Sequence, residues 1–213
     1  MNISVLISGR GSNLQSLIDA QLAGQLSARI VSVISNNEKA PGLKRAIKAN
    51  IPFAVIDHTK CRTREEFDAI LHDKLVAAKI DLVCLAGFMR LLTDQFVESW
   101  RDRLINIHPS LLPSFKGLNT HERALKSGVR FSGCTTHYVR PAMDSGPIIA
   151  QGIVPILPGD NPVTLAKRVL IAEHRLYPAT VRMAAEGKLA VINELVHFKD
   201  ASFSETLIVS PEL

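Results

Sequence analysis

Short apolar segments alternate with amphipathic helical patterns along the first half of this chain, and this alternation restricts the fold more than any other feature. Between the first two segments, Leu14, Leu17 and Ile18 recur at the spacing of a helix with one buried face. Strands that alternate with helices pair in parallel and are covered by helices on both faces. The sequence therefore predicts an α/β fold with a mostly parallel, twisted sheet. The segments that we interpret as its strands are 3–7, 30–34, 53–56, 82–86 and 104–107.

The second half of the chain adds two more strands, at 134–139 and 148–154, and a long helix over 161–186. Beyond the helix, 190–192 and 207–209 predict two small strands that form an antiparallel pair. The chain has 213 residues and no repeats or low-complexity linker. We therefore expect a single Rossmann-like domain over the whole chain.

Charge and cysteine content restrict the partners and the compartment. The net charge is +5, but Lys and Arg are scattered rather than gathered in runs, which favours small anionic substrates over nucleic acid. Cys61, Cys84 and Cys134 do not have the spacing of a metal site, and an odd count without a secretory signal indicates a reducing, cytoplasmic environment. No apolar segment is long enough to span a membrane. We expect a cytoplasmic monomer or homodimer that uses no metal, nucleic acid or membrane.

A glycine-rich turn over 8–13 joins the first strand to the first helix. A helix N-terminus exposes unpaired N–H groups and positive charge, which suits a phosphate, and glycine lets the backbone approach closely. Ser12 or Asn13 could cap the helix or contact the phosphate. Leu14 stands where a dinucleotide-binding motif would have its third glycine, so a dinucleotide is disfavoured. The alternatives are a phosphate site and a tight structural turn.

Asn106 and His108 lie at the end of the strand predicted over 104–107, where Pro109 prevents the strand from continuing. Side chains alternate along a strand, so both point to the same side, roughly 6.6 Å apart. Asn can donate a hydrogen bond to a developing oxyanion, and His can move a proton near neutral pH. The pair could therefore catalyse acyl transfer at the carboxyl end of the sheet, where ligands bind in α/β proteins. The alternative is a polar strand end with an exposed histidine.

Five other features carry chemistry of their own. Arg64 is either a surface arginine or a ligand contact, and 89–92 could form the wall of a pocket or a loop packed on the core. Glu173 lies on the apolar face of the long helix, so its carboxylate needs a partner or a cationic ligand, unless it reaches solvent at the edge of that face. Asp144 is the one acidic side chain of its loop. His137, inside a strand, is interpreted as an ordinary structural histidine.

Three separate stretches, 9–14, 105–113 and 144–149, resemble the folate-dependent formyltransferases, and the likeness runs in order over nearly the whole chain. The second and third stretches are typical of the superfamily. The first stretch and the short length resemble the members that formylate glycinamide ribonucleotide (GAR) in purine synthesis. The sequence departs from the family pattern at Lys116-Gly117 and Arg140-Pro141, which leaves the loop shape and the folate-tail contacts open.

The resemblance implies a role for each candidate residue. About 1–100 would be a phosphate-binding half, about 101–189 a catalytic and folate-binding half, and 190–213 a tail without transferable functional residues. The implied catalytic residues are Asn106, His108 and Asp144. The implied contacts with GAR are Gly11, Ser12 and Asn13 at the ribose phosphate and Glu173 at the amino group. The implied folate contacts are Arg64, at the glutamate tail, and Met89, Arg90, Leu91, Leu92, Asn106, Arg140, Pro141, Ala142, Met143 and Asp144.

The resemblance also implies direct transfer of the formyl group from 10-formyltetrahydrofolate to the GAR amine through a tetrahedral intermediate. Asn106 and protonated His108 would stabilise the oxyanion, His108 would pass a proton to the departing folate nitrogen, and Asp144 would favour the charged imidazole. The alternatives are hydrolysis of the folate by the same residues, formylation of methionyl-tRNA, for whose additional domain we expect no room, and a non-enzymatic nucleotide-binding module. In such a module the three side chains should lie far apart.

Overall fold

A seven-stranded sheet forms the centre of the protein, for which the computed structural model describes residues 1–200 and 208–210. The strands follow the order β3-β2-β1-β4-β5-β6-β7. Strands β1 to β5 are parallel, whereas β6 and β7 run antiparallel to their neighbours. The predicted mostly parallel fold is confirmed. The bounds are β1 (Asn2–Ile7), β2 (Arg29–Ser35), β3 (Phe53–Val55), β4 (Leu82–Leu85), β5 (Leu104–His108), β6 (Phe131–Tyr138) and β7 (Ile148–Pro155).

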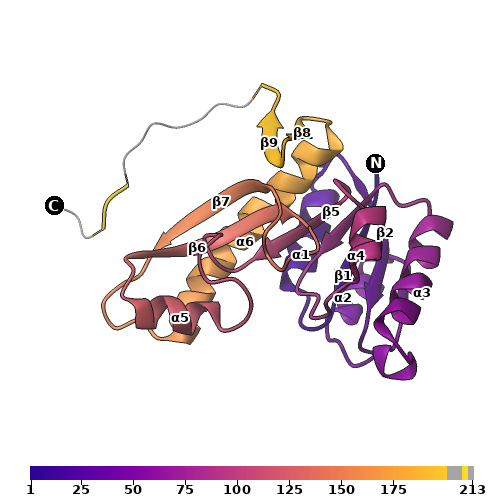
Figure 1. The fold of residues 1–213 in the computed structure, drawn as a ribbon, viewed down its shortest axis with the longest axis horizontal. Helices are drawn as coiled ribbons and strands as arrows, with labels where there is room; N and C mark the ends of the chain where they lie inside the picture. Colours follow the sequence, from indigo (N-terminus) through magenta and orange to yellow (C-terminus); the bar gives the residue numbers. More distant parts are fainter. Residues whose placement is uncertain (201–207, 211–213) are drawn as a thin grey trace.

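Helices cover both faces of this sheet, as predicted (Figure 1). Successive side chains of a strand point to opposite faces. Val5 accordingly packs in one apolar core with residues of α1, α2 and α6, whereas Leu6 packs in a second core with residues of α3 and α4. The bounds are α1 (Ser12–Leu22), α2 (Leu43–Lys48), η1 (His58–Lys60), α3 (Arg64–Ala77), α4 (Asp94–Ser99), α5 (Thr120–Ser127) and α6 (Pro162–Ala185).

The strand order reverses at β1, and in open α/β sheets a crevice lies outside the carboxyl ends of the strands at such a point. From β1 the chain builds β2 and β3 on one side, and then returns to place β4 and β5 on the other. In open α/β sheets ligands bind where the strand order reverses in this way. In Figure 1, β1 to β4 and α3 lie toward one end of the molecule and β6, β7 and α5 toward the other. Strand β5, with its polar end, lies between the two.

The small terminal sheet differs from the prediction in its second strand. β8 (Leu189–Ile192) pairs antiparallel with β9 (Leu195–Phe198), not with 207–209. Leu207 lies outside the described residues, and Ile208 and Val209 are not in a strand. The two strands are joined by a two-residue turn with φ of 51° at Asn193 and 59° at Glu194. Such a turn normally carries Gly at the second position. Because this position is Glu194, the sequence lacks the usual signal of a hairpin.

Helix α6 is fixed to the sheet by a buried hydroxyl. Tyr177 is fully buried, and its hydroxyl oxygen lies 2.8 Å from the carbonyl oxygen of Leu85 and 3.2 Å from that of Ile105. These carbonyls belong to the neighbouring strands β4 and β5. Since Glu173 lies one helical turn before Tyr177, this contact also sets the height of Glu173 above the sheet.

Replacing Tyr177 by Phe should lower the free energy of unfolding by about 1–3 kcal/mol, because it leaves buried carbonyl groups short of a partner. For a chain of this size, each kcal/mol corresponds to a fall in Tm of about 2–4 °C, which calorimetry can measure. Ile171→Ala on the exposed side of the same helix is the control and should change stability by less than about 0.5 kcal/mol. Equal Tm values for Tyr177→Phe and the wild type would contradict this account.

Candidate active site

The predicted catalytic residues come together from one strand and one loop. Asn106 and His108 project from the carboxyl end of β5, and Asp144 lies in the loop between β6 and β7. Nδ1 of His108 is 3.4 Å from Oδ2 of Asp144, and these side chains are only 7% and 12% exposed. An imidazole and a carboxylate therefore lie within ion-pair distance in a nearly buried site. A non-enzymatic nucleotide-binding module would not need this arrangement.

Asp144 is held in place by the two loops that flank it. The backbone N–H of Gly117 donates a hydrogen bond to Oδ2 of Asp144 at 2.8 Å. Within the loop of Asp144 itself, Gly146 packs so tightly that a Cβ atom there would lie 1.8 Å from the carbonyl oxygen of Tyr138. Only glycine can take this position without moving the backbone. The glycine of the predicted motif over 144–149 thus lets the loop fold back onto β6 and aim the carboxylate at His108.

Both ring nitrogens of His108 face hydrogen-bond acceptors. While Nδ1 faces Asp144, Nε2 lies 3.1 Å from the carbonyl oxygen of Phe115. The loop that supplies this carbonyl is tied back to β6, because the hydroxyl of Thr135 donates to the carbonyl of Ser110 at 2.6 Å. An imidazole can satisfy two acceptors only when both nitrogens carry protons. Each ring nitrogen of His108 therefore has an acceptor within reach when it carries a proton.

His137 is a site residue that sequence reasoning missed, since it was interpreted as an ordinary structural histidine. It lies directly across the sheet from Asn106, and its Nε2 is 3.2 Å from Nδ2 of Asn106 and 3.9 Å from Oδ1 of Asp144. No local signal marks it, because the antiparallel register of β6 against β5 is set by contacts between distant segments. Cross-strand neighbours are visible only once that register is known.

The environment of His137 selects one tautomer. Burial is the largest effect on this ring and lowers its pKa, although the hydrogen bond with Tyr138 acts in the other direction. In the neutral ring, the Nδ1–H group donates to the carbonyl of Tyr138 at 2.9 Å, which leaves Nε2 to accept from the amide of Asn106. The second N–H of that amide remains available as a donor. His137 thus fixes the orientation of the Asn106 amide.

The predicted phosphate loop leaves the first turn of α1 without a side-chain cap. The helix starts at Ser12 after the N-cap residue Gly11, which has φ of 67° and provides no side-chain cap. A Cβ atom at Gly11 would lie 2.8 Å from Cα of Gly42, so this close approach requires glycine. The N–H groups at this helix start are therefore available to an anion. A cavity of about 610 Å³ between α1 and α6 is lined by Ser12 and His174, among others.

Glu173 is buried and meets Asn13. Its Oε2 accepts a hydrogen bond from Nδ2 of Asn13 at 2.7 Å, across 160 positions of sequence. Burial raises the pKa of the carboxyl group, and the hydrogen bond from Asn13 only partly opposes this effect. Oδ1 of Asn13 is buried without a hydrogen-bond partner among the described residues. The alternative that Glu173 reaches solvent is wrong, and a carboxylate with a nearby unpaired amide oxygen suits a ligand with N–H donors.

The predicted folate contacts differ in how they are presented. Met89 and Leu91 are 67% and 61% exposed, whereas the guanidinium of Arg90 packs 4.8 Å from the ring centroid of Phe67. Phe88 next to them is buried, so the segment is partly pocket wall and partly core. Arg90 and Met89 also line a cavity of about 530 Å³ at the ends of β1 to β4, which sequence reasoning did not predict.

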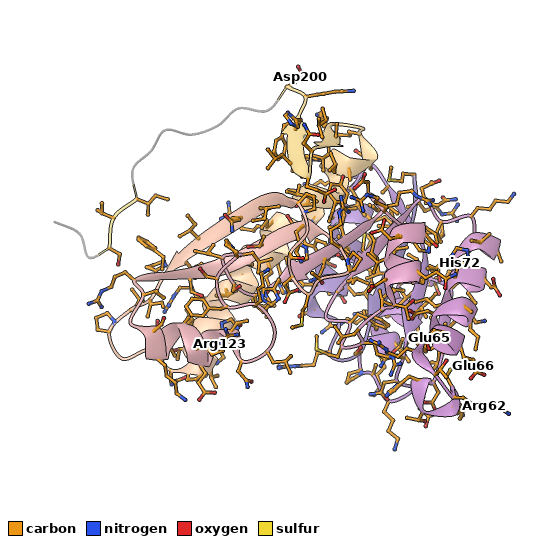
Figure 2. The ribbon with its side chains drawn as sticks, viewed as in Figure 1. Arg62, Glu65, Glu66, His72, Arg123 and Asp200 are labelled. Carbon is orange, nitrogen blue, oxygen red and sulfur yellow. The ribbon has the colours of Figure 1, made fainter. Side chains whose placement is uncertain are left out.

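The remaining folate candidates lie at two sites. Arg64 is in the exposed first turn of α3, a turn marked in Figure 2 by Glu65 and Glu66. Pro141, Ala142 and Met143 are exposed in the loop of Asp144. Arg140 is the exception, because its guanidinium is buried and already paired with Asp102 and Glu194. Its side chain is not presented to a ligand.

The cysteines are not arranged for nucleophilic or metal chemistry. Burial raises the pKa of the thiols of Cys84 and Cys134 to about 12, so both remain protonated at neutral pH. Cys61 is half-buried, and none of the three forms a disulfide. Across residues 1–200 and 208–210, no group of three or more His, Cys, Asp or Glu side chains is placed to hold a metal ion. Over the same ranges, no helix is long and apolar enough to cross a membrane.

Comparison with known proteins agrees with this geometry. The family model described as formyl transferase matches residues 1–181. The chain belongs to this family. It is 42% identical over 189 residues to phosphoribosylglycinamide formyltransferase of Escherichia coli, with 89% of each chain covered, and 40% identical over 195 residues to that of Haemophilus influenzae, with 92% of each chain covered.

Larger relatives and solved structures show the same likeness. The human trifunctional purine biosynthetic protein adenosine-3 is 50% identical over 185 residues, but the chain spans only 18% of that protein's length. Among solved structures, glycinamide ribonucleotide transformylase 1 of Symbiobacterium toebii has a TM-score of 0.92 at 44% identity, with 94% of both chains covered. Phosphoribosylglycinamide formyltransferase of Anaplasma phagocytophilum has a TM-score of 0.89 at 44% identity, with 95% and 96% covered.

We expect His137 to remain neutral at pH 7.5 with its proton on Nδ1, since burial lowers its pKa from the ordinary value of about 6.5. The tautomer and pKa can be measured from the ¹⁵N shifts of the imidazoles, with a His137→Gln variant to assign the signal. A proton on Nε2, or a titration above pH 7, would contradict the role of His137 as acceptor for Asn106.

Proposed function

We propose that this protein transfers the formyl group of 10-formyltetrahydrofolate to the amino group of GAR, giving formyl-GAR and tetrahydrofolate in purine synthesis. The observation that carries the proposal is the 3.4 Å contact between His108 and Asp144 beside the amide of Asn106. It occurs in a chain that the formyl transferase family model matches over residues 1–181. The names of the bacterial relatives support GAR as acceptor.

The acceptor would lie between α1 and α6. The uncapped N–H groups at Gly11, Ser12 and Asn13 suit its ribose phosphate. Glu173, which needs a partner for its buried charge, suits the amine of GAR or its adjacent amide. Phosphate and amine would thus be fixed from two helices, so that the amine is oriented before it reacts. This division supports a GAR-binding half at about 1–100, completed by one helix from beyond it.

The formyl donor would lie along the other side of the crevice. Exposed Met89 and Leu91 and the exposed loop residues 141–143 offer an apolar wall of the kind that flat heterocycles use. Arg64, at the exposed start of α3, would pair with the glutamate carboxylates of the folate. Arg90, which packs on Phe67, and Leu92, which packs against the core, would support this wall from the protein side. The half at about 101–189 would supply the rest of the folate site and the catalytic residues.

The reaction would proceed in two chemical steps at these residues. The GAR amine attacks the formyl carbon, and the free N–H of Asn106 together with protonated His108 stabilises the oxyanion. The intermediate then collapses: His108 supplies a proton to the folate nitrogen, the C–N bond to the folate breaks, and the proton released by the attacking amine nitrogen returns to the imidazole. Asp144 favours the charged imidazole before transfer. Because Nε2 of His108 contacts the carbonyl of Phe115 in the free protein, that contact must give way before this nitrogen can deliver its proton.

His108→Ala and Asp144→Ala should each lower kcat for GAR-dependent transfer by about 10²–10⁴-fold with little change in either KM, because they remove proton transfer and not binding. Absorbance of the folate product, with and without GAR, measures the rate. The exposed Asp73→Ala on α3 is the matched control and should keep wild-type kcat. Turnover by the wild type that does not require GAR would favour hydrolysis, and full activity of either variant would rule out the mechanism.

Glu173→Gln should raise the KM for GAR about tenfold, since it removes a charged acceptor from the amine. It should also stabilise the protein near neutral pH. The pKa of Glu173 is raised in the folded state, so its ionisation destabilises the wild type above that pKa and has no effect below the unfolded value, where both states are protonated.

The gain in Tm from Glu173→Gln should therefore be present at pH 7.5 and disappear as the pH falls toward about 4.5. Calorimetry over this range provides the measurement. Glu122→Gln is the control, because Lys126 lowers the pKa of that exposed carboxyl and the substitution should give no gain at pH 7.5. A gain that persists at acid pH, or an unchanged KM, would contradict the placement of Glu173.

A further inference from the structure

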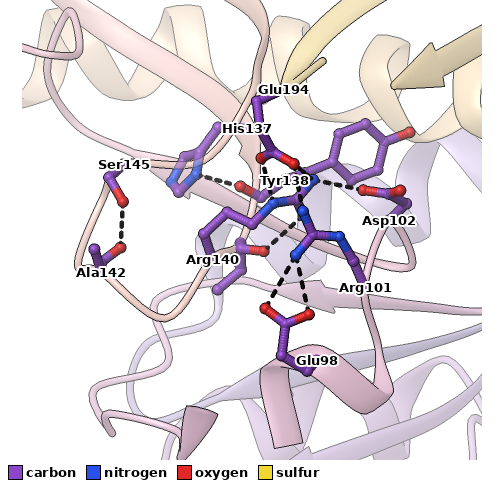
Figure 3. A network of polar contacts seen from close by, with 10 residues as sticks. Glu98, Arg101, Asp102, His137, Tyr138, Arg140, Ala142, Ser145 and Glu194 are labelled. Atoms are coloured by element: carbon purple, nitrogen blue, oxygen red, sulfur yellow. Dashed lines mark hydrogen bonds and ion pairs between the residues drawn. The ribbon is translucent and has the colours of Figure 1, made fainter. Parts of the chain in front are cut away.

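Arg140 begins the loop of Asp144 and is held by two carboxylates from other parts of the chain (Figure 3). Its Nε donates to Oε2 of Glu194 at 2.6 Å, and its Nη2 donates to Oδ1 of Asp102 at 2.7 Å. A third donor, Nη1, lies 3.1 Å from the carbonyl oxygen of Val139. The Arg140 side chain is only 8% exposed. Three donors of this buried side chain are thus satisfied, although the carboxylates of Asp102 and Glu194 are themselves 44% and 52% exposed, and the forked geometry makes the contact directional.

The two carboxylates connect the catalytic loop to distant segments. Asp102 lies in the turn just before β5, the strand that carries Asn106 and His108, and Glu194 lies in the turn of the β8–β9 hairpin. Arg101 also pairs with Glu194 and with Glu98 at the end of α4, as Figure 3 shows. The hairpin, to which the sequence assigned no functional residue, is therefore connected through Arg140 to the start of the catalytic loop.

The left-handed backbone conformation at Glu194 indicates that its carboxylate is retained for its contacts with other residues. Glu194 is the second residue of the two-residue hairpin turn, with φ of 59°. This position favours glycine, since a side chain there costs energy in the left-handed region. Nothing in the turn itself requires Glu, and its two carboxylate oxygens contact Arg140 and Arg101. The ion pairs thus offset a backbone cost that glycine would avoid.

A short series of contacts within the loop connects Arg140 to Asp144. The loop is closed at its base by the N–H of Tyr138, which donates to the carbonyl of Pro147 at 2.9 Å. Gly146 packs against Tyr138 and against Cγ of Arg140, which a Cβ atom at Gly146 would approach to 3.1 Å. Within the loop, the hydroxyl of Ser145 donates to the carbonyl of Ala142 at 2.6 Å. A movement of Arg140 would therefore displace the neighbouring Gly146 and the carboxylate two residues before it.

We propose that Arg140 is a positioning residue for formyl transfer and that Glu194 of the terminal hairpin, together with Asp102, fixes it so that Asp144 faces His108. The inference rests on the proposed function and assigns a role in it to the tail. The guanidinium does not contact substrate; it holds the loop against the segment that leads into β5. Loss of either carboxylate leaves a buried charge underpaired, and the loop shifts to reach water or another acid.

Glu194→Gly is the decisive variant, because glycine favours the φ of this turn while the carboxylate is removed. The backbone gain at the turn should offset the lost ion pairs, so we expect its Tm to stay close to that of the wild type, its kcat to fall on the order of tenfold, and its KM for GAR to stay within about twofold. Asn193→Gly, at the other left-handed position of the same turn, is the matched control and should keep wild-type kcat. A Glu194→Gly variant with wild-type kcat would overturn the proposal.

The pairing itself is tested by a double-mutant cycle. Arg140→Met should lower kcat as Glu194→Gly does, and the double variant should lose no more than the more affected single variant, because both substitutions remove one contact. Arg140→Lys keeps the charge but not the forked geometry and should recover part of kcat. Fully multiplicative losses in the double variant would show that Arg140 and Glu194 act independently, and would overturn the coupling.

A second readout does not depend on turnover. The imidazole ¹⁵N and ¹H signals of His108 and His137 should move in Glu194→Gly and not in Asn193→Gly, since Asp144 lies beside both rings. Unmoved signals in Glu194→Gly would overturn the proposal even if kcat fell. Absence of GAR-dependent transfer in the wild type would instead refute the proposed function, while the signals of the two histidines would still report whether the hairpin positions the loop.

Discussion

The contact between His108 and Asp144 is the interaction on which the rest of the site depends. Its partners are separated by 36 positions of sequence, and they meet at 3.4 Å only because β6 returns antiparallel beside β5 and the following loop folds back. A buried carboxylate is costly unless it is paired, so the N–H of Gly117 and the imidazole must both be in place. The tight loop at Gly146, the neutral His137 and the orientation of Asn106 all belong to this arrangement.

The buried carboxylate of Glu173, on the side proposed for the formyl acceptor, is likewise stabilised by a hydrogen-bond partner. Glu173 is held below the surface by the helix that Tyr177 fixes to β4 and β5, and it meets Asn13 on the first turn of α1. Two helices that pack against each other therefore define one half of the crevice, while a strand and a loop define the other. In the proposed reaction this division would let each reactant be oriented by its own elements before the amine meets the formyl carbon.

Much of this could be predicted from local patterns, and the failures have physical causes. The alternation of apolar segments and helices gave the sheet, and the polar residues at the end of β5 identified Asn106 and His108 before any contact was known. His137 was missed because its importance comes from its cross-strand neighbour Asn106. The pairing of β8 with β9 was missed because Glu194 occupies a turn position where glycine would be the usual signal.

The sequence by itself therefore determined the class of fold, the strand end that carries the amide and the imidazole, and the glycine turn at the start of α1. These features follow from periodicity and from the conformational limits of Gly and Pro, which act over a few residues. Only the tertiary structure decided the tautomer of His137, the burial of Glu173 and the pairing of Arg140 with Asp102 and Glu194. Those properties depend on dielectric environment and on neighbours far away along the chain, which no local pattern records.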